Sequence, residues 1–246
     1  MNWPDFTGRA RGLRQAACLL GCSALSACGS SSDQSVAQGR QLFESQALSP
    51  SHLNIYTCKT CHDVEADRTP LIKAGAVLAG VTSRPLFWGG QVADLLGAVN
   101  ACRNYFMVAN QPLSATDADA HSLYAYLASL EPGDSEQVPF TIVTEIDALP
   151  RGDADHGQVL FAAACSYCHG DMHHGIGRFS GLPILPEDTI AAHARYSPRS
   201  QRLVFTEKIR HGLFLGYGGM MPPFSSERLS DEDVSDLLEA LGVLGE

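Results

Sequence analysis

The pentapeptide Cys58-Lys59-Thr60-Cys61-His62 recurs 107 positions later as Cys165-Ser166-Tyr167-Cys168-His169. Two thiols three positions apart on one helical turn can form thioethers with the two vinyl groups of a porphyrin, and the adjacent histidine can then ligate the iron. A Cys-x-x-Cys pair alone would fit a redox dithiol or half of a zinc site equally well. A histidine directly after the second cysteine, in both copies, favours covalent haem c, so the chain is predicted to carry two haems. The predicted attachment residues are Cys58, Cys61, Cys165 and Cys168, with His62 and His169 on the irons.

The first 27 residues have the layout of an export signal. Three arginines between positions 9 and 14 precede an apolar stretch, residues 15–27, that is too short to span a bilayer. The stretch ends in Leu25-Ser26-Ala27-Cys28, which resembles the lipobox of a bacterial lipoprotein. A second candidate, Leu19-Leu20-Gly21-Cys22, leaves a very short apolar region. An ordinary cleaved signal without a lipid is the other alternative, and either kind of signal implies that the mature chain is exported.

The lipobox predicts a location as well as a cleavage site. Residues 28–35 are predicted to form a tether rich in serine, and Gly29 rather than Asp follows the lipidated Cys28. The sorting tendency of bacterial lipoproteins then points to the outer membrane. The expected location is the bacterial periplasm, with the lipid on Cys28 as the anchor to the membrane.

The eight cysteines divide almost completely among these predicted roles. Cys18 and Cys22 leave with the signal, Cys28 carries lipid and four cysteines hold haem. Cys102 remains without a partner. It is therefore either a small buried residue, as free cysteines often are, or a ligand to iron.

The remaining 219 residues are long enough for two small domains. The first cytochrome-like unit is predicted over residues 36–131 and the second over residues 153–246. Between them, residues 132–152 begin with turn-forming and charged residues and are predicted to be a linker.

Both units are predicted to be all-α and wrapped around a flat cofactor, with little sheet. Gly39 and Gly157 each precede an apolar and aromatic pair, which suits a close crossing of two helices. The closing helix of each unit is predicted to begin at a cap, Thr116 in the first and Ser230 in the second, followed by carboxylates.

These patterns together resemble the class I cytochrome c family over nearly all of residues 34–246. In that family a methionine before prolines supplies the sixth iron ligand, which implies Met221, followed here by Pro222 and Pro223. A thioether ligand raises the reduction potential by stabilising ferrous iron. Met220 could exchange roles with Met221. A bis-histidine site is a further alternative, with candidates His173, His174 and His211, the last expected on a surface helix.

The first unit departs from the family pattern. Asp63 stands where the second unit has Gly170, and no Met-Pro sequence precedes the closing helix. Met107 is the predicted sixth ligand. Cys102 is the alternative metal ligand, because its surroundings resemble the diheme cytochromes of sulfur oxidation, in which a thiolate can bind the iron.

Two such sites indicate electron transfer between periplasmic or membrane-bound redox proteins, because six-coordinate iron has no open position for oxygen or peroxide. Residues 28–246 hold 14 Lys and Arg against 26 Asp and Glu, a net charge of −12. This acidity disfavours nucleic acid as a partner. Two enzyme alternatives stay open: oxidation of thiosulfate or a related sulfur compound, with Arg84 or Arg103 binding the anion, and a diheme peroxidase.

Overall fold

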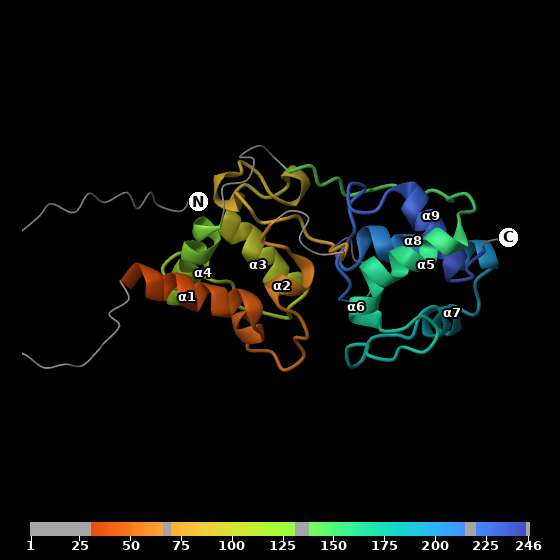
Figure 1. Cartoon of the computed structure of the whole chain (residues 1–246), viewed down its shortest axis with the longest axis horizontal. Helices are drawn as coiled ribbons and strands as arrows, with labels where there is room; N and C mark the ends of the chain where they lie inside the picture. Colours follow the sequence, from red (N-terminus) through yellow and green to blue (C-terminus); the bar gives the residue numbers. More distant parts are fainter. Residues whose placement is uncertain (1–30, 66–69, 131–137, 215–219, 245–246) are drawn as a thin grey trace, which may run out of the picture.

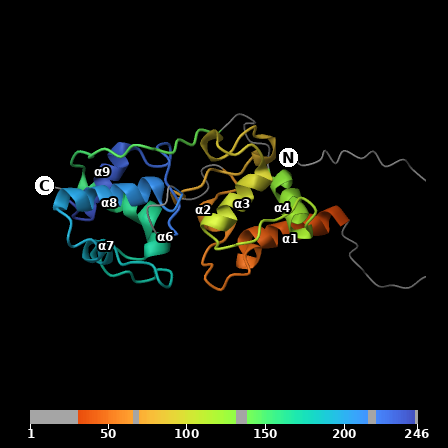
Figure 2. The same cartoon turned by 180° about the vertical axis from the view of Figure 1, so that it is seen from behind.

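The computed structural model describes residues 31–65, 70–130, 138–214 and 220–244. In these ranges the chain forms two helical units that lie side by side (Figures 1 and 2). They contain no β-strand, and the single bridge between Phe87 and Val92 is isolated. The all-α fold is therefore confirmed. The predicted export signal and Cys28 lie outside the described residues. None of the described helices has both the length and the apolarity needed to cross a bilayer.

Four helices form the first unit. They are α1 (Ser31–Glu44), α2 (Cys58–Cys61), α3 (Leu95–Tyr105) and α4 (Ala118–Ser129), with 3-10 turns at Gln46–Leu48, Val81–Ser83 and Trp88–Gly90. The second unit contains α5 (Ala154–Leu160), a π-helical turn (Phe161–Cys165), α6 (Ser166–His169), α7 (Glu187–Ala192), α8 (Pro198–His211) and α9 (Asp231–Ala240). Each unit has its own core of buried apolar side chains.

The first and last helices of each unit cross closely, α1 on α4 and α5 on α9 (Figure 1). A glycine makes each crossing possible. A Cβ added at Gly39 would lie 1.9 Å from the carbonyl oxygen of Ser122, and one at Gly157 would lie 2.0 Å from that of Asp236. The prediction of glycine at two helix crossings is confirmed.

We expect Gly39→Ala to lower the free energy of unfolding by about 1–3 kcal/mol, because the new methyl group meets rigid backbone. The matched control is Gly97→Ala within α3, where the nearest atom to an added Cβ is Val92 Cγ1 at 3.1 Å. Alanine favours helix over glycine by about 0.5–1 kcal/mol, which offsets that tighter contact. Chemical denaturation of both variants measures the difference, and equal stabilities would contradict the steric account.

Helix starts were predicted with mixed success. Ser230 caps α9 and forms a reciprocal capping box with Asp233, as predicted. Thr116 does not cap α4: Asp117 occupies the N-cap position, and its carboxylate accepts a hydrogen bond from the Ser114 amide at 2.7 Å instead. Helix α1 begins at Ser31, so residues 31–35 of the predicted tether are helical. Asp33 in its first turn favours that early start, because a carboxylate stabilises the positive end of a helix.

The described end of the linker, residues 138–152, runs from the first unit to the second: Val138 and Phe140 line a cavity in the first unit, and Thr141 and Val143 contact the second. Thr141 donates two hydrogen bonds to the Glu227 carboxylate, from its amide at 2.8 Å and from its hydroxyl at 2.6 Å. Burial raises the pKa of Glu227, but these bonds outweigh it and lower the pKa to about 2. Further along, the Val143 carbonyl accepts a hydrogen bond from His211.

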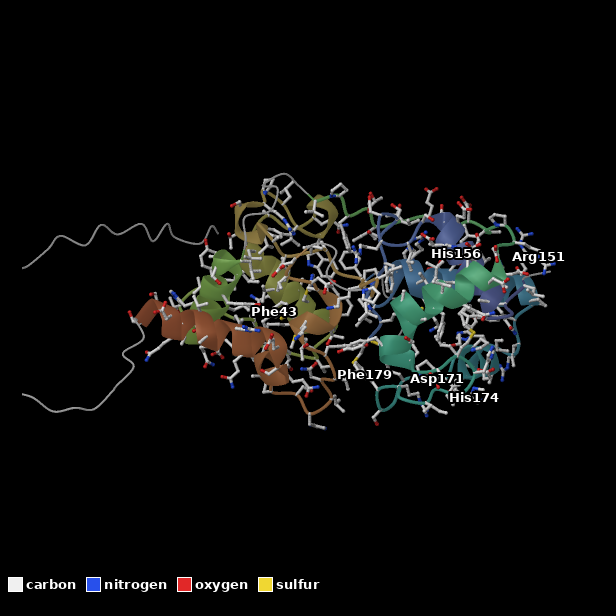
Figure 3. The ribbon with its side chains drawn as sticks, viewed as in Figure 1. Phe43, Arg151, His156, Asp171, His174 and Phe179 are labelled. Carbon is white, nitrogen blue, oxygen red and sulfur yellow. The ribbon has the colours of Figure 1, made fainter. Side chains whose placement is uncertain are left out.

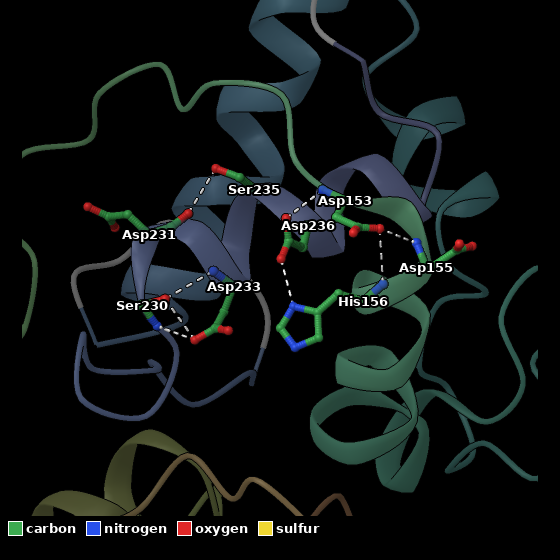
Figure 4. A network of polar contacts seen from close by, with 8 residues as sticks. All are labelled: Asp153, Asp155, His156, Ser230, Asp231, Asp233, Ser235 and Asp236. Carbon is green, nitrogen blue, oxygen red and sulfur yellow. Dashed lines mark hydrogen bonds and ion pairs between the residues drawn. The ribbon is translucent and has the colours of Figure 1, made fainter.

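A buried carboxylate fixes the start of α5 against α9 (Figure 4). Asp236, 4% exposed, accepts hydrogen bonds from the Asp153 amide at 2.6 Å and from His156 Nδ1 at 2.7 Å. The hydrogen bond to Asp236 is the main reason that the pKa of His156 is raised above its ordinary value of 6.5.

We therefore expect folding to raise the pKa of His156. A raised pKa stabilises the folded state below pH 6.5, and this contribution is lost as the pH rises through the folded-state value. Asp236→Asn should return the His156 pKa towards 6.5 in an NMR titration. An unchanged pKa in that variant would contradict the assignment.

Candidate haem sites

Both predicted iron-binding histidines are held in the same way. His62 Nδ1 donates to the Ala76 carbonyl at 2.7 Å, and His169 Nδ1 donates to the Pro183 carbonyl at 3.1 Å. In each case the acceptor lies 14 residues after the histidine. This bond leaves Nε2 free to bind a metal, and a backbone carbonyl on the other ring nitrogen is the usual support of a metal-bound histidine. Burial lowers the pKa of both imidazoles, which keeps them in the neutral form that binds metal.

None of the four predicted attachment cysteines forms a disulfide with another described residue. Helix α2, which carries Cys58 and Cys61, starts at a capping box formed by Thr57 and Thr60. Burial raises the pKa of Cys58 to about 12 and that of Cys168 to about 11. Burial also raises the pKa of Cys61, and the nearby thiols Cys102 and Cys168 add to that effect.

A large, mainly apolar cavity adjoins the first motif. It brings together Cys58, Cys61 and His62 with both candidates for the sixth ligand, Cys102 and Met107. Cys102 lies on α3, and Met107 follows that helix and is 4% exposed. The cavity is closed by aromatic side chains from several segments of the first unit: Phe43, Tyr56, Phe87, Trp88 and Phe106.

Arg84 brings an unpaired polar atom to this cavity. Its Nη2 atom donates to the Val77 and Ala79 carbonyls at 2.5 and 2.8 Å, whereas its buried Nε has no partner among the residues that the structure describes. A carboxylate such as a haem propionate would satisfy this nitrogen. Arg103 also lines this cavity; it is 6% exposed and donates to the Leu48 and Gln111 carbonyls, and its role in binding an anion stays a prediction.

Two residues of the first site have backbone conformations that L-residues rarely adopt. Trp88 lines the cavity with φ of 53°, and Val108, directly after Met107, has φ of 55°. Such conformations cost about 1–3 kcal/mol each and concentrate at functional sites. The surrounding structure therefore fixes the loop that presents Met107.

Met221 and Cys165 pack against the core of the second unit, whereas Met220 and Cys168 pack against the core of the first unit. The Met221 carbonyl accepts a hydrogen bond from the Leu213 amide at 2.9 Å, just beyond the end of α8. Gly212 makes this close approach possible: its φ is 51°, and an added Cβ would lie 2.1 Å from the Met221 oxygen. Met221 as the ligand on the second iron stays a prediction.

The alternative histidines have other partners. His173 Nδ1 lies 2.7 Å from the Glu187 carboxylate on the surface, and His174 is exposed. His211 is buried, not on a surface face as expected. One of its ring nitrogens contacts Glu207 at 2.6 Å, and the other contacts the Val143 carbonyl.

Several functional positions could not be found from the sequence. A Cβ at Gly75 would lie 2.4 Å from Cε1 of His62, so Gly75 is needed where the chain passes the ring. Gly212 is likewise defined only by tertiary contacts; Arg84 was a candidate from the sequence, but its unpaired nitrogen was not. Taken together, the paired cysteines, the supported imidazoles and the Arg84 Nε atom fit covalent haem at the first motif; paired cysteines and a supported imidazole fit it at the second.

Comparison with known proteins agrees with this chemistry. Residues 152–239 match the family model described as "Cytochrome C oxidase, cbb3-type, subunit III". That part of the chain is therefore similar to a cytochrome c-type domain, a kind of domain that holds haem c covalently and exchanges electrons with redox proteins. No curated protein sequence matches the chain.

Among solved structures, the chain is similar to thiosulfate dehydrogenase (TsdBA) from Marichromatium purpuratum, in its as-isolated form. The identity is 17% and the TM-score is 0.44. The similarity covers 87% of this chain and 46% of the other, so the chain spans less than half of that structure's length.

Proposed function

We propose that the protein is a diheme c-type cytochrome that transfers electrons between redox partners. The observation that carries the proposal is the repeated support of His62 and His169, each next to a pair of cysteines and each bonded to a carbonyl 14 residues later. The two haems would be held by the cysteines of residues 58–61 and 165–168. Haem iron with protein ligands on both faces supplies outer-sphere electron transfer.

The side chains of the two sites favour unequal potentials. Met221 lies in a loop stiffened by two prolines and bonded to the end of α8, which suits a constant thioether ligand and a higher potential. At the first site, Met107 and Cys102 both line the cavity. Thiolate ligation by Cys102 would give the first haem the lower potential, and we expect electrons to enter there.

We also propose export to the bacterial periplasm and anchoring to the outer membrane through a lipidated Cys28. The lipobox at residues 25–28 supports this location. The net charge of −12 on residues 28–246 supports docking to redox proteins through an acidic surface. Mass spectrometry of the mature N-terminus tests the proposal. An N-terminus at a residue other than Cys28 would contradict it.

Oxidation of thiosulfate or another small sulfur compound is the second candidate function. One observation favours it: the Cys102 thiol lines the cavity of the first site, near those of Cys58 and Cys61. Burial raises the pKa of Cys102 to about 12, so its thiol is protonated unless a metal binds it. The peroxidase alternative has no comparable support.

Cys102→Ala separates the two functions. If electron carriage through a Met107 ligand is the function, the absorption spectrum and the midpoint potential of the first haem should stay as in the unsubstituted protein. A large rise in that potential, with loss of reduction by thiosulfate, would instead identify Cys102 as the ligand and favour the enzyme. Spectroelectrochemical titration and a thiosulfate assay measure both outcomes.

A further inference from the structure

Residues 72–76, here called the strap, hold the first motif from one side. Lys73 Nζ donates to the Lys59 carbonyl at 3.0 Å and the His62 carbonyl at 3.3 Å. It also pairs with the Asp63 carboxylate at 2.7 Å, with both side chains largely buried. The Gly75 amide donates to the Cys61 carbonyl at 2.8 Å, and the Ala76 carbonyl is the acceptor for His62 Nδ1.

The same strap is bound to the second unit. The Ile72 amide donates to the Ala163 carbonyl at 2.9 Å, two residues before Cys165. Arg228 Nε, from the loop before α9, donates to the Lys73 carbonyl at 2.8 Å. Ala74 is 4% exposed and belongs to the core of the second unit, although its neighbours Lys73 and Gly75 contact the first motif.

Other contacts show that the two units meet at both sites. The Trp88 ring stacks on Phe214, with ring centroids 4.7 Å apart, and Pro222 and Pro223 line the cavity of the first site. Phe179 packs against the core of the first unit and lies on the side of the second unit nearest to it (Figure 3). The strap is therefore one part of a packed junction between the units.

We propose that the second unit positions His62 through the strap, with Arg228 as the positioning residue, so that the redox potential of the first haem depends on docking of the two units. This inference rests on the proposed function, because it requires a haem at the first motif. Arg228 contacts neither the cysteines nor His62 and acts through the Lys73 carbonyl.

The direction of the effect follows from the hydrogen bond at the ring. A carbonyl that accepts the Nδ1 proton makes the imidazole a stronger donor to iron, which favours the ferric state and lowers the potential. Gly75 leaves no spare room beside the ring, so a small displacement of the strap changes the placement of His62. Releasing the strap should therefore raise the potential of the first haem.

The test is Arg228→Ala in the full-length protein with both haems bound. We expect the midpoint potential of the first haem to rise, that of the second to stay unchanged, and the amides of Ile72 and Gly75 to exchange hydrogen faster. Loss of a positive charge near a haem would by itself lower its potential, so the sign separates release of the strap from a simple charge effect. Arg228→Lys, which keeps a donor, should restore part of the unsubstituted potential.

Arg151→Ala is the matched control, because Arg151 pairs with Glu239 on the surface of the second unit, at the end away from the first unit (Figure 3). It should leave the first potential unchanged. Gly75→Ala disturbs His62 directly and should shift that potential without Arg228 being altered.

Three outcomes would overturn the proposal. The first is faster amide exchange in Arg228→Ala while the midpoint potential of the first haem stays unchanged. The second is an equal change of that potential in Arg228→Ala and in Arg151→Ala. The third is an unchanged potential of the first haem in Gly75→Ala. Failure of the proposed function appears separately and earlier, as unsubstituted protein without haem on Cys58 and Cys61.

Discussion

Replacing both Cys165 and Cys168 with alanine should reduce the haem content from two to one per chain. The two motifs carry separate thiol pairs, and Cys58, Cys61, His62 and both candidate sixth ligands of the first site lie within the first unit. Alanine cannot form the thioether that links a porphyrin vinyl group to the chain. The pyridine haemochrome spectrum of the purified variant, normalised to protein, measures the loss of half the haem.

Cys102→Ala is the control for that count, since it removes a cysteine that no Cys-x-x-Cys-His sequence includes. It should keep two haems. If the double variant loses both haems, the first site cannot form without the second, and the assignment of one independent covalent site to each unit is wrong.

Met221→His should lower the potential of the second haem by about 0.1 V or more, because axial ligands shift haem potentials over a range of roughly 0.8 V. Histidine is a stronger donor than a thioether and favours ferric iron. The absorption band near 695 nm that a Met–Fe(III) bond gives should be lost for that haem. Spectroelectrochemical titration resolves the two potentials.

Met220→Leu is the matched control, because Met220 packs against the core of the first unit, whereas Met221 packs against that of the second. It should leave the second potential unchanged. If Met220→Leu lowers that potential and Met221→His does not, the two methionines have exchanged roles.

The sequence predicted what depends on local chemistry and short spacing. The all-α fold, the glycines at the two helix crossings and the Ser230 cap follow from helical periodicity and capping rules, which act within a few residues. The predicted N-cap of α4, Thr116, was one position too early. Two potential caps, Thr116 and Asp117, are adjacent, and each can also form hydrogen bonds with nearby loop amides.

The rest depends on contacts between distant segments. Arg103 donates to the carbonyls of Leu48 and Gln111, which lie 55 and 8 residues away in the chain, so these contacts could not be predicted from the sequence. His211 was expected on the surface. Its burial could not be predicted, because the residue that contacts it, Val143 in the linker, lies 68 residues earlier in the chain. The roles of Gly75 and Arg228 depend on the tertiary contacts of the strap, and no periodic pattern in the sequence indicates those contacts.

The structure also explains why the first unit has Asp63 where the second has Gly170. Glycine in the second unit, Gly170, has φ of 68° and closes a tight turn after its motif. In the first unit, Asp63 instead binds Lys73, which holds the strap against the haem motif. The difference between the two units is thus tied to the junction between them.

The most direct test of the account is mass spectrometry of proteolytic fragments from the protein produced with its export signal. We predict one haem c on the peptide that contains residues 58–62 and one on the peptide that contains residues 165–169. Free thiols or a disulfide at either motif in the exported protein would contradict the account of two covalent haems.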